Sequence, residues 1–496
     1  MVAFQLDQRG RSLRSLHRPL SIFGIAILAV STAAAQGAQT ITVHCGKTDS
    51  AVTHVTYKRG VDHPFDLGNS PSAIVDAVTT DVQNGDLNFL NAALDQLNVI
   101  TDSQLFTYSA PNLDYSASGN APLVTTFQDL LNSSVITVPK TTVQVSGMPY
   151  VYNGNADPNY EPLCNAVGHY YPLPSLSTMG AEQTAVENWI DYLNSKYPNA
   201  IWTGTQEPTH TTGFSTQWDN GGCSNPPSSD MGAAKENNIS RFISYWAPIA
   251  QHLHANNIQT GGIQLNAADA QYYASAAQSI ISAGMPLDYF TLQVYRPSAT
   301  VFQDAYNAYE NFQQNTNYKN VKVVIDRYGL RSAGSTTPPD YASASTLIAY
   351  LQNEALLMPY ADMMYGYNVE QGGLEGNSTN SSTNLPQVLT WLQKAPEPLR
   401  VVSSSTSDLQ GLALVRSTAP QKAYVAVWND SANGTTYNFS VDLYNLSSSF
   451  TTSNLTIQKG SGSSLSIISN SGITISGDTI SGLSLGANEF LLITLE

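Results

Sequence analysis

The chain has 496 residues, of which 42% are hydrophobic and only 12% charged, and its formal net charge is −16. This acidic balance argues against a nucleic-acid groove and against adhesion to anionic lipid, and it favours neutral or cationic partners, of which uncharged carbohydrate is one class. The length exceeds what one hydrophobic core organises, so two or three domains are expected.

An export signal is expected at the start of the chain. Several arginines, the last of them Arg18, precede an apolar run that closes in small residues near Ala35 and Ala38. That order is typical of a cleaved signal peptide, which we assign to residues 1–38, with a secreted or periplasmic location. A retained signal anchor is the alternative, but the apolar run is short for a membrane span. We therefore expect no membrane partner after cleavage.

Short apolar runs then alternate with longer helical patterns. Runs typical of strands buried on both faces cover 200–205, 258–266, 287–295, 321–329 and 360–368. Helical patterns cover 86–97, 180–197, 238–257 and 268–284. This alternation predicts βαβ units and a parallel sheet. No glycine-rich phosphate loop follows the first strand, and the later runs end in polar residues, which favours a (β/α)₈ barrel over residues 39–395 with its site at the C-terminal strand ends.

The pattern changes after the barrel region. Short alternating runs cover 411–417, 423–429, 436–446, 453–458, 464–469, 472–477 and 489–496. Glycine, serine and asparagine separate them, and no helical period is present. The predicted fold class is therefore α/β, a (β/α)₈ barrel followed by an all-β sandwich over residues 396–496.

Two carboxylates are expected at the same rim of the barrel. Glu207 follows the run 200–205, and Asp326 lies in the run 321–329, three strand-like runs later. Cleaving a glycosidic bond needs one carboxyl group to protonate the leaving oxygen and another to attack the anomeric carbon or to activate water. A second carboxylate nearby also raises the pKa of the acid. Glu370, just after the last barrel run, is the alternative partner for Glu207.

The order of these motifs resembles clan A glycoside hydrolases, and most of all family 39. "WTGTQEP" is similar to that family's strand-four Asn-Glu-Pro motif, with Gln206 in place of Asn. "LDYFTLQVY" resembles the strand-six segment, with Gln293 where His is usual and Tyr295 retained. "VVIDRYG" resembles the strand-seven segment, with Asp326 where Glu is usual, and "MMYGYNVEQGG" resembles strand eight. The resemblance implies that Glu207 is the acid/base and Asp326 the nucleophile.

Aromatic and polar residues near these motifs are candidate sugar ligands. Trp218 lies in a polar loop, and aromatic faces pack against the C–H faces of pyranose rings. The candidate substrate-binding residues are Gln206, His210, Trp218, Gln293, Tyr295, Tyr367 and Asn368. Trp202 and Trp246 are instead expected in the core.

The aspartate leaves the mechanism and even the activity open. Asp326 is one methylene shorter than Glu, which draws its carboxylate back by about 1.5 Å. A retaining mechanism is the first expectation, and an inverting one with Asp326 as the base is the alternative. Asp326 paired with Arg327 would serve structure only. The function expected is a secreted glycoside hydrolase acting on a plant or microbial polysaccharide or oligosaccharide, and the alternative is an inactive carbohydrate-binding or matrix protein on a decayed barrel.

Cysteines and histidines indicate no metal site or cofactor. Cys164 and Cys223 lie in loop-like surroundings and are the preferred disulfide pair, with Cys45 left over. No Cys/His spacing resembles a zinc site. A polysaccharide lyase is a third hypothesis. The low count of 21 lysines and arginines argues against it. The sequence does not predict the oligomeric state.

Overall fold

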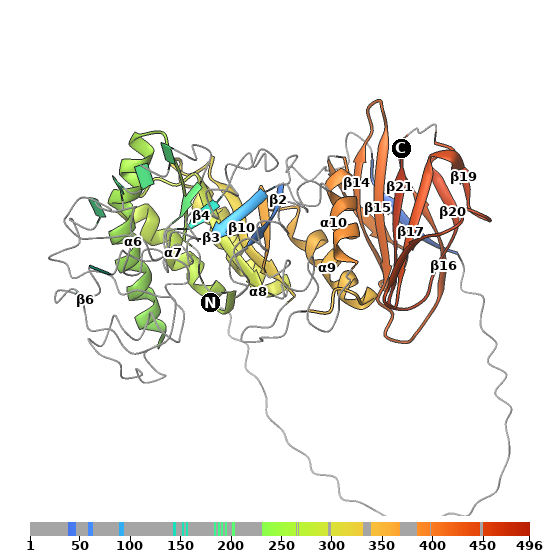
Figure 1. Cartoon of the computed structure of the whole chain (residues 1–496), viewed down its shortest axis with the longest axis horizontal. Helices are drawn as coiled ribbons and strands as arrows, with labels where there is room; N and C mark the ends of the chain where they lie inside the picture. The colour runs from blue at the N-terminus through green and yellow to red at the C-terminus, as the bar shows by residue number, and fades with distance from the viewer. Residues whose placement is uncertain are drawn as a thin grey trace, which may run out of the picture. The chain divides into compact units, whose positions relative to one another are not determined.

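The computed structural model contains a closed barrel of parallel strands, two larger sheets of five and six strands, and a small two-stranded sheet in the part of the chain that it describes (Figure 1). It describes residues 38–45, 58–62, 89–93, 142–144, 151–152, 155–156, 183–184, 187–188, 190–191, 194–195, 201–203, 231–263, 265, 267–295, 299–330, 339–367, 384–396, 398–446 and 450–496. Of the expected signal peptide, only Ala38 lies among these residues.

Eight strands close the barrel in the order β10-β11-β2-β3-β4-β7-β8-β9. Their bounds are β2 Lys58–Asp62, β3 Phe89–Ala93, β4 Thr142–Gln144, β7 Ile201–Thr203, β8 Gln259–Gly262, β9 Tyr289–Tyr295, β10 Lys322–Gly329 and β11 Met363–Tyr367. Every neighbouring pair is parallel. All C-terminal strand ends therefore lie at one rim, where a (β/α)₈ barrel builds its site.

Helices alternate with the strands from β7 onward. Their bounds are α6 Met231–Ala255, η1 Ala267–Tyr272, α7 Tyr273–Ala283, α8 Ala299–Gln313, α9 Ala344–Leu357 and α10 Leu385–Lys394. Residues described within 183–195 are also helical. Trp202 and Trp246 are 0% and 1% exposed, which confirms that both belong to the core. Helix α7 ends at Gly284, whose φ of 60° permits the left-handed cap that closes the helix.

One helical prediction in the first half is wrong. The pattern over 86–97 favoured a helix, but Phe89–Ala93 forms strand β3, paired with β2 and β4. Alanine and leucine are good helix formers, but helix propensity is a small energy per residue that tertiary context overrides. Closure of the barrel supplies the context, because without β3 its neighbours would each expose an unpaired edge.

Side chains of four barrel strands pack together in the described part of the structure. Ile201, Tyr289, Val324 and Met363 form a separate buried cluster, contributed by four different strands. Burial is the main cause that raises the pKa of Tyr289, so its phenol stays neutral at physiological pH. This packing is typical of (β/α)₈ barrels, whose sites are built at the C-terminal rim.

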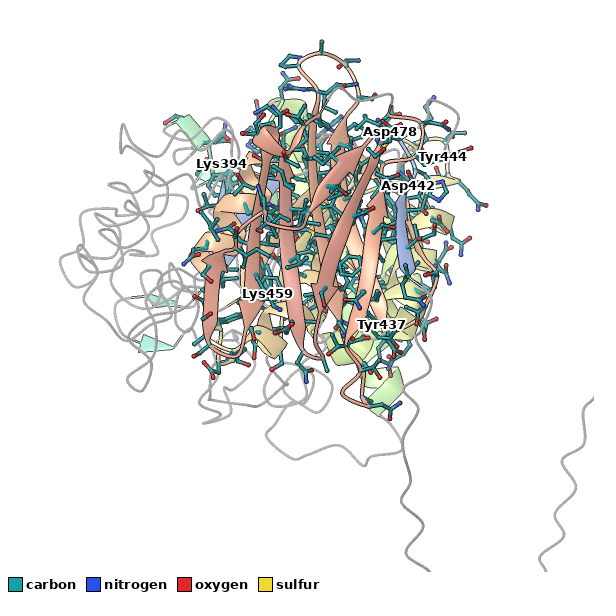
Figure 2. The ribbon with its side chains drawn as sticks, turned by 90° about the vertical axis from the view of Figure 1, so that its right-hand side faces the viewer. Lys394, Tyr437, Asp442, Tyr444, Lys459 and Asp478 are labelled. Atoms are coloured by element: carbon teal, nitrogen blue, oxygen red, sulfur yellow. The ribbon has the colours of Figure 1, made fainter. Side chains whose placement is uncertain are left out.

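Two further sheets build the sandwich, one of five strands and one of six. The five-stranded order is β13-β1-β16-β20-β19 and the six-stranded order is β12-β14-β15-β21-β17-β18. The bounds are β1 Gln39–Val43, β12 Leu399–Arg400, β13 Val402–Ser404, β14 Leu409–Arg416, β15 Lys422–Asn429, β16 Tyr437–Asp442, η3 Thr452–Asn454, β17 Leu455–Ser461, β18 Ser464–Ile467, β19 Thr474–Ser476, β20 Thr479–Leu485 and β21 Glu489–Leu495. Figure 2 labels Tyr437 on β16 and Lys459 on β17. A two-stranded sheet pairs β5 Val151–Tyr152 with β6 Asn155–Ala156.

The central strands of the six-stranded sheet, β14, β15 and β21, are largely buried on both faces. Along β15, Val425 and Val427 pack into the core shared with the other sheet, whereas Tyr424, Ala426 and Trp428 pack into the core shared with the barrel helices. Helices α9 and α10 cover this second face (Figure 1). The strand therefore reads as a continuous apolar run although its sheet is antiparallel.

Strand β1 corrects the expected start of the barrel domain. Residues 39–43 fell within the barrel range, but they pair with β13 and with β16 of the sandwich. Ile41 and Val43 of this strand are fully buried in the sandwich core. The sandwich is thus assembled from both sides of the barrel sequence, and residues from Ala38 to Glu496 form one compact unit.

Candidate active site

The strands that carry or precede the candidate carboxylates in sequence all belong to the parallel barrel. Strand β7 ends at Thr203, shortly before Glu207, and Asp326 lies in β10. The order β7-β8-β9-β10 confirms that the two strands are three positions apart around the barrel. Glu370 follows β11, the neighbour of β10. The side chains of all three carboxylates lie outside the described part of the structure, so the choice of pair stays a prediction.

Asp326 lies at a β-bulge. Ile325 pairs with Leu292 of β9, whereas Arg327 pairs with Gln293, the next residue, so the register skips Asp326. The register with β11 shifts over the same interval. A bulge inserts one residue and bends its strand, and bulges are over-represented beside active sites because they re-aim a side chain.

Gln293 is a buried polar residue of β9. Its exposed fraction is 3%, and its backbone N–H donates to the hydroxyl of Tyr273, 3.1 Å away. The same hydroxyl accepts a hydrogen bond from the N–H of Leu265, just after β8, at 3.2 Å. One helix-borne hydroxyl therefore fixes two neighbouring chain segments at the candidate rim. Tyr273 was not among the predicted site residues, because a tyrosine in an apolar helix pattern is typical of the core.

A second polar network holds β10. The hydroxyl of Tyr328 donates to Oε1 of Glu354 in α9 at 2.6 Å, and its oxygen lies 2.7 Å from that of Tyr350. All three side chains are buried. Tyr350 and Glu354 are four residues apart and so share one helix face. The i, i+4 spacing of Tyr350 and Glu354 was the sequence signal for this network. It did not lead to a prediction, because a glutamate in a helix is usually exposed to solvent.

Two aspartates at the opposite rim have a structural role. Asp288 Oδ2 accepts the backbone N–H of Thr260 at 2.8 Å, and Asp362 Oδ2 accepts that of Val323 at 3.0 Å. The N–H of Asp288 and that of Asp362 in turn donate to the carbonyl oxygens of the same two partners. Each aspartate thus ties the start of its strand to a neighbouring strand, away from the rim that carries the candidate carboxylates.

The structure places only some of the predicted site residues. Gln293 is described in full, and the backbone positions of Tyr295, Asp326 and Tyr367 are given within their strands. The following lie outside the described residues: Cys164, Gln206, Glu207, His210, Trp218, Cys223, Asn368 and Glu370. Cys45 is buried, with its sulfur 3.5 Å from the carbonyl oxygen of Val43.

Neither a cluster of metal ligands nor a helix that could span a membrane occurs among the described residues. No three or more histidine, cysteine, aspartate or glutamate side chains gather there in a way that could hold a metal ion. None of the helices seen in these segments is long and apolar enough to cross a membrane.

Solved structures with the same architecture are similar to the chain at low identity. The catalytic domain of a family 30 xylanase C from Talaromyces cellulolyticus has a TM-score of 0.55 and 15% identity, covering 92% of this chain and 100% of that one. A glucosidase from Croceicoccus marinus has a TM-score of 0.56 and 12% identity over 92% and 98% of the two chains. A family 44 xyloglucanase from Paenibacillus polymyxa has a TM-score of 0.55 and 11% identity over 92% and 99%. No protein-family profile and no curated protein matches the sequence.

These likenesses show that the chain shares its fold with solved glycoside hydrolases. At identities of 11–15% they show the fold alone. Among the similar structures are members of families 30, 44 and 86, and the narrower expectation of family 39 is not supported.

Proposed function

We propose that the chain is a glycoside hydrolase that cleaves O-glycosidic bonds of an oligosaccharide or polysaccharide with two carboxylates at the barrel rim. The observation that carries the proposal is the bulge of β10 at Asp326. Strand β10 lies three strands from β7 in the parallel barrel. The likeness in fold to glycoside hydrolases supports it. Glu207 is the proton donor in this proposal, and Asp326 is the second carboxylate, with Glu370 as its alternative.

The chemistry needs no cofactor. Glu207 donates a proton to the leaving oxygen as the glycosidic bond breaks, while Asp326 attacks the anomeric carbon and forms a covalent glycosyl-enzyme. Glu207 then takes a proton from water, which displaces Asp326 and releases the sugar. In the inverting alternative Asp326 activates water directly, and no covalent intermediate forms.

The substrate class follows from charge and from the neighbours. The net charge of −16 disfavours strongly acidic glycans. The neighbours include a xylanase, a xyloglucanase bound to xyloglucan and a protein bound to neoagarooctaose. We therefore expect a neutral glycan backbone as the substrate. Gln206, Gln293, Tyr295 and the residues grouped with them above are the proposed sugar ligands.

Reducing-end release tests the proposal. The mature protein is incubated with xylan, xyloglucan, agarose, galactan, arabinogalactan and bacterial exopolysaccharide. Glu207→Gln should lower the rate on the cleaved glycan by about 10²–10⁴-fold, the usual contribution of a general acid. Asp326→Asn should lower it at least as much, and proton NMR of the first product separates retention from inversion.

A matched control comes from the opposite rim. Asp362→Asn makes the same chemical change on the neighbouring strand, where the carboxylate accepts the N–H of Val323. It should lower stability but keep the turnover number. If Glu370→Gln abolishes activity and Asp326→Asn does not, the second carboxylate is Glu370.

A carbohydrate-binding protein without activity is the second candidate. Gln206, Gln293 and Asp326 all depart from the family motif that the sequence resembles, as a decayed enzyme would. Wild-type protein that binds one of these glycans without releasing reducing ends would establish this candidate and refute the hydrolase.

We also propose that the protein is exported and cleaved near Ala38. Strand β1 begins at Gln39, so cleavage there would leave the sandwich intact. The intact mass of protein recovered from the medium or periplasm tests this, and a mass that retains the first 35 residues would refute it.

A further inference from the structure

Glu354 is the one carboxylate among the described residues that is completely buried, with an exposed fraction of 0%. Removing a carboxyl group from water is costly unless hydrogen bonds compensate, and an apolar side chain of similar size would pack at lower cost. Glu354 accepts a hydrogen bond from Tyr328, whose hydroxyl also contacts that of Tyr350. Packing alone therefore does not account for this residue.

The partner of Glu354 lies at the bulge of β10. The register with β9 skips Asp326, so the strand ladder does not by itself hold that residue. On one side of the bulge, Ile325 packs into the core between strands and helices. On the other side, the ring of Tyr328 packs into the same core, and its hydroxyl donates a hydrogen bond to Glu354. The bulge is thus anchored at both ends, and the second anchor is polar and directional.

We propose that Glu354 is a positioning residue for Asp326: by fixing Tyr328, it sets where the bulge of β10 holds the candidate carboxylate. Glu354 acts through Tyr328 and two peptide units and does not touch the substrate. The catalytic consequence rests on the proposed function, whereas the anchoring of β10 does not. Hydrogen bonds to a buried carboxyl group are short and oriented, which suits this task better than an apolar contact.

Three substitutions separate positioning from ordinary stability. Tyr328→Phe removes the hydroxyl and keeps the ring, and Glu354→Gln keeps the shape and one acceptor oxygen. The control is Tyr318→Phe, which removes another buried hydroxyl of the helix layer. The Tyr318 hydroxyl donates to the carbonyl oxygens of Met285, at 3.0 Å, and Ile280, both of which lie outside β10.

Two measurements are made on each variant of the mature chain. Hydrogen exchange of the peptide over residues 322–330, read by mass spectrometry, reports the anchoring of β10. Values of kcat and KM on the glycan that the wild type cleaves report the consequence for catalysis. Tyr328→Phe should speed exchange at least about tenfold, because amide protection reports local opening. It should lower kcat about 10- to 100-fold with KM within about twofold, since a misplacement near 1 Å costs that much.

The outcomes are distinct. Glu354→Gln should change exchange and kcat in the same direction by less, and Tyr318→Phe should change neither. Exchange of β10 that is equal in the Tyr328→Phe and Tyr318→Phe variants refutes the anchoring. Faster exchange with unchanged kcat in an active enzyme refutes the positioning role. Faster exchange in a protein that cleaves no glycan supports the anchoring and refutes the proposed function.

Discussion

Replacing Tyr273 by phenylalanine tests how the candidate rim is held together. The hydroxyl of Tyr273 accepts two backbone N–H groups, those of Leu265 and Gln293, at 3.2 and 3.1 Å. Each buried donor left without this acceptor costs about 1–3 kcal/mol. Because the surroundings relax in part, we expect the free energy of unfolding to fall by about 2–4 kcal/mol. Chemical denaturation, followed by the fluorescence of the buried tryptophans, measures it.

Tyr318→Phe is the matched control for this prediction. Its hydroxyl is also buried, but it donates to the carbonyl oxygens of Met285 and Ile280. Carbonyl oxygens tolerate the loss of one donor better than N–H groups tolerate the loss of an acceptor. We expect a loss of about 0.5–1.5 kcal/mol in this variant. Equal losses in the two variants would refute the argument that Tyr273 acts as the acceptor for two chain segments.

Two predictions concern the sandwich. Gly460 of β17 pairs with Phe490, whose ring occupies the space that a Cβ would need, so Gly460→Ala should cost about 1–3 kcal/mol in denaturant unfolding. The double variant with Phe490→Leu should recover part of that loss, and strict additivity would contradict this contact. Burial raises the pKa of Glu489, but hydrogen bonds, the first from Lys459 (labelled in Figure 2), together hold it below the ordinary 4.5. A carboxyl group whose pKa is lowered by folding stabilises the protein at pH values above its pKa in the unfolded chain. This stabilisation is lost as the pH falls through the pKa of the folded state. Glu489→Gln should therefore be less stable than wild type at pH 7, with the difference shrinking below about pH 4, and a pH-independent difference would contradict it.

The barrel strands of the second half were predictable from the sequence, and those of the first half were not. Runs such as 287–295 are apolar or β-branched on both faces, because one face packs on helices and the other in the barrel interior. Residues 89–93 carry alanine and leucine, which suit a helix equally well. Only closure of the barrel decides their state, and closure is a property of distant segments.

The candidate site was predictable in its strand order but not in its detail. The order of motifs placed Asp326 three strands from β7, which the structure confirms. The bulge depends on how β9 and β11 pair with β10, and no residue type in β10 predicts it. The supporting hydroxyls of Tyr273 and Tyr328 were not predictable either, because their partners are backbone groups or a glutamate in another element.

Strand β1 has a consequence for how the chain folds as it is made. Thr40 lies beside Ser440, 400 positions later, in the parallel pair of β1 and β16. Strand β1 therefore cannot pair until the ribosome has made the strands β13 and β16, near the end of the chain. Until then Ile41 and Val43 remain exposed, and a nascent chain that stops after Lys394 leaves them without the strands that bury them. The sandwich core that buries β1 therefore forms only after the strands that follow the barrel have been synthesised.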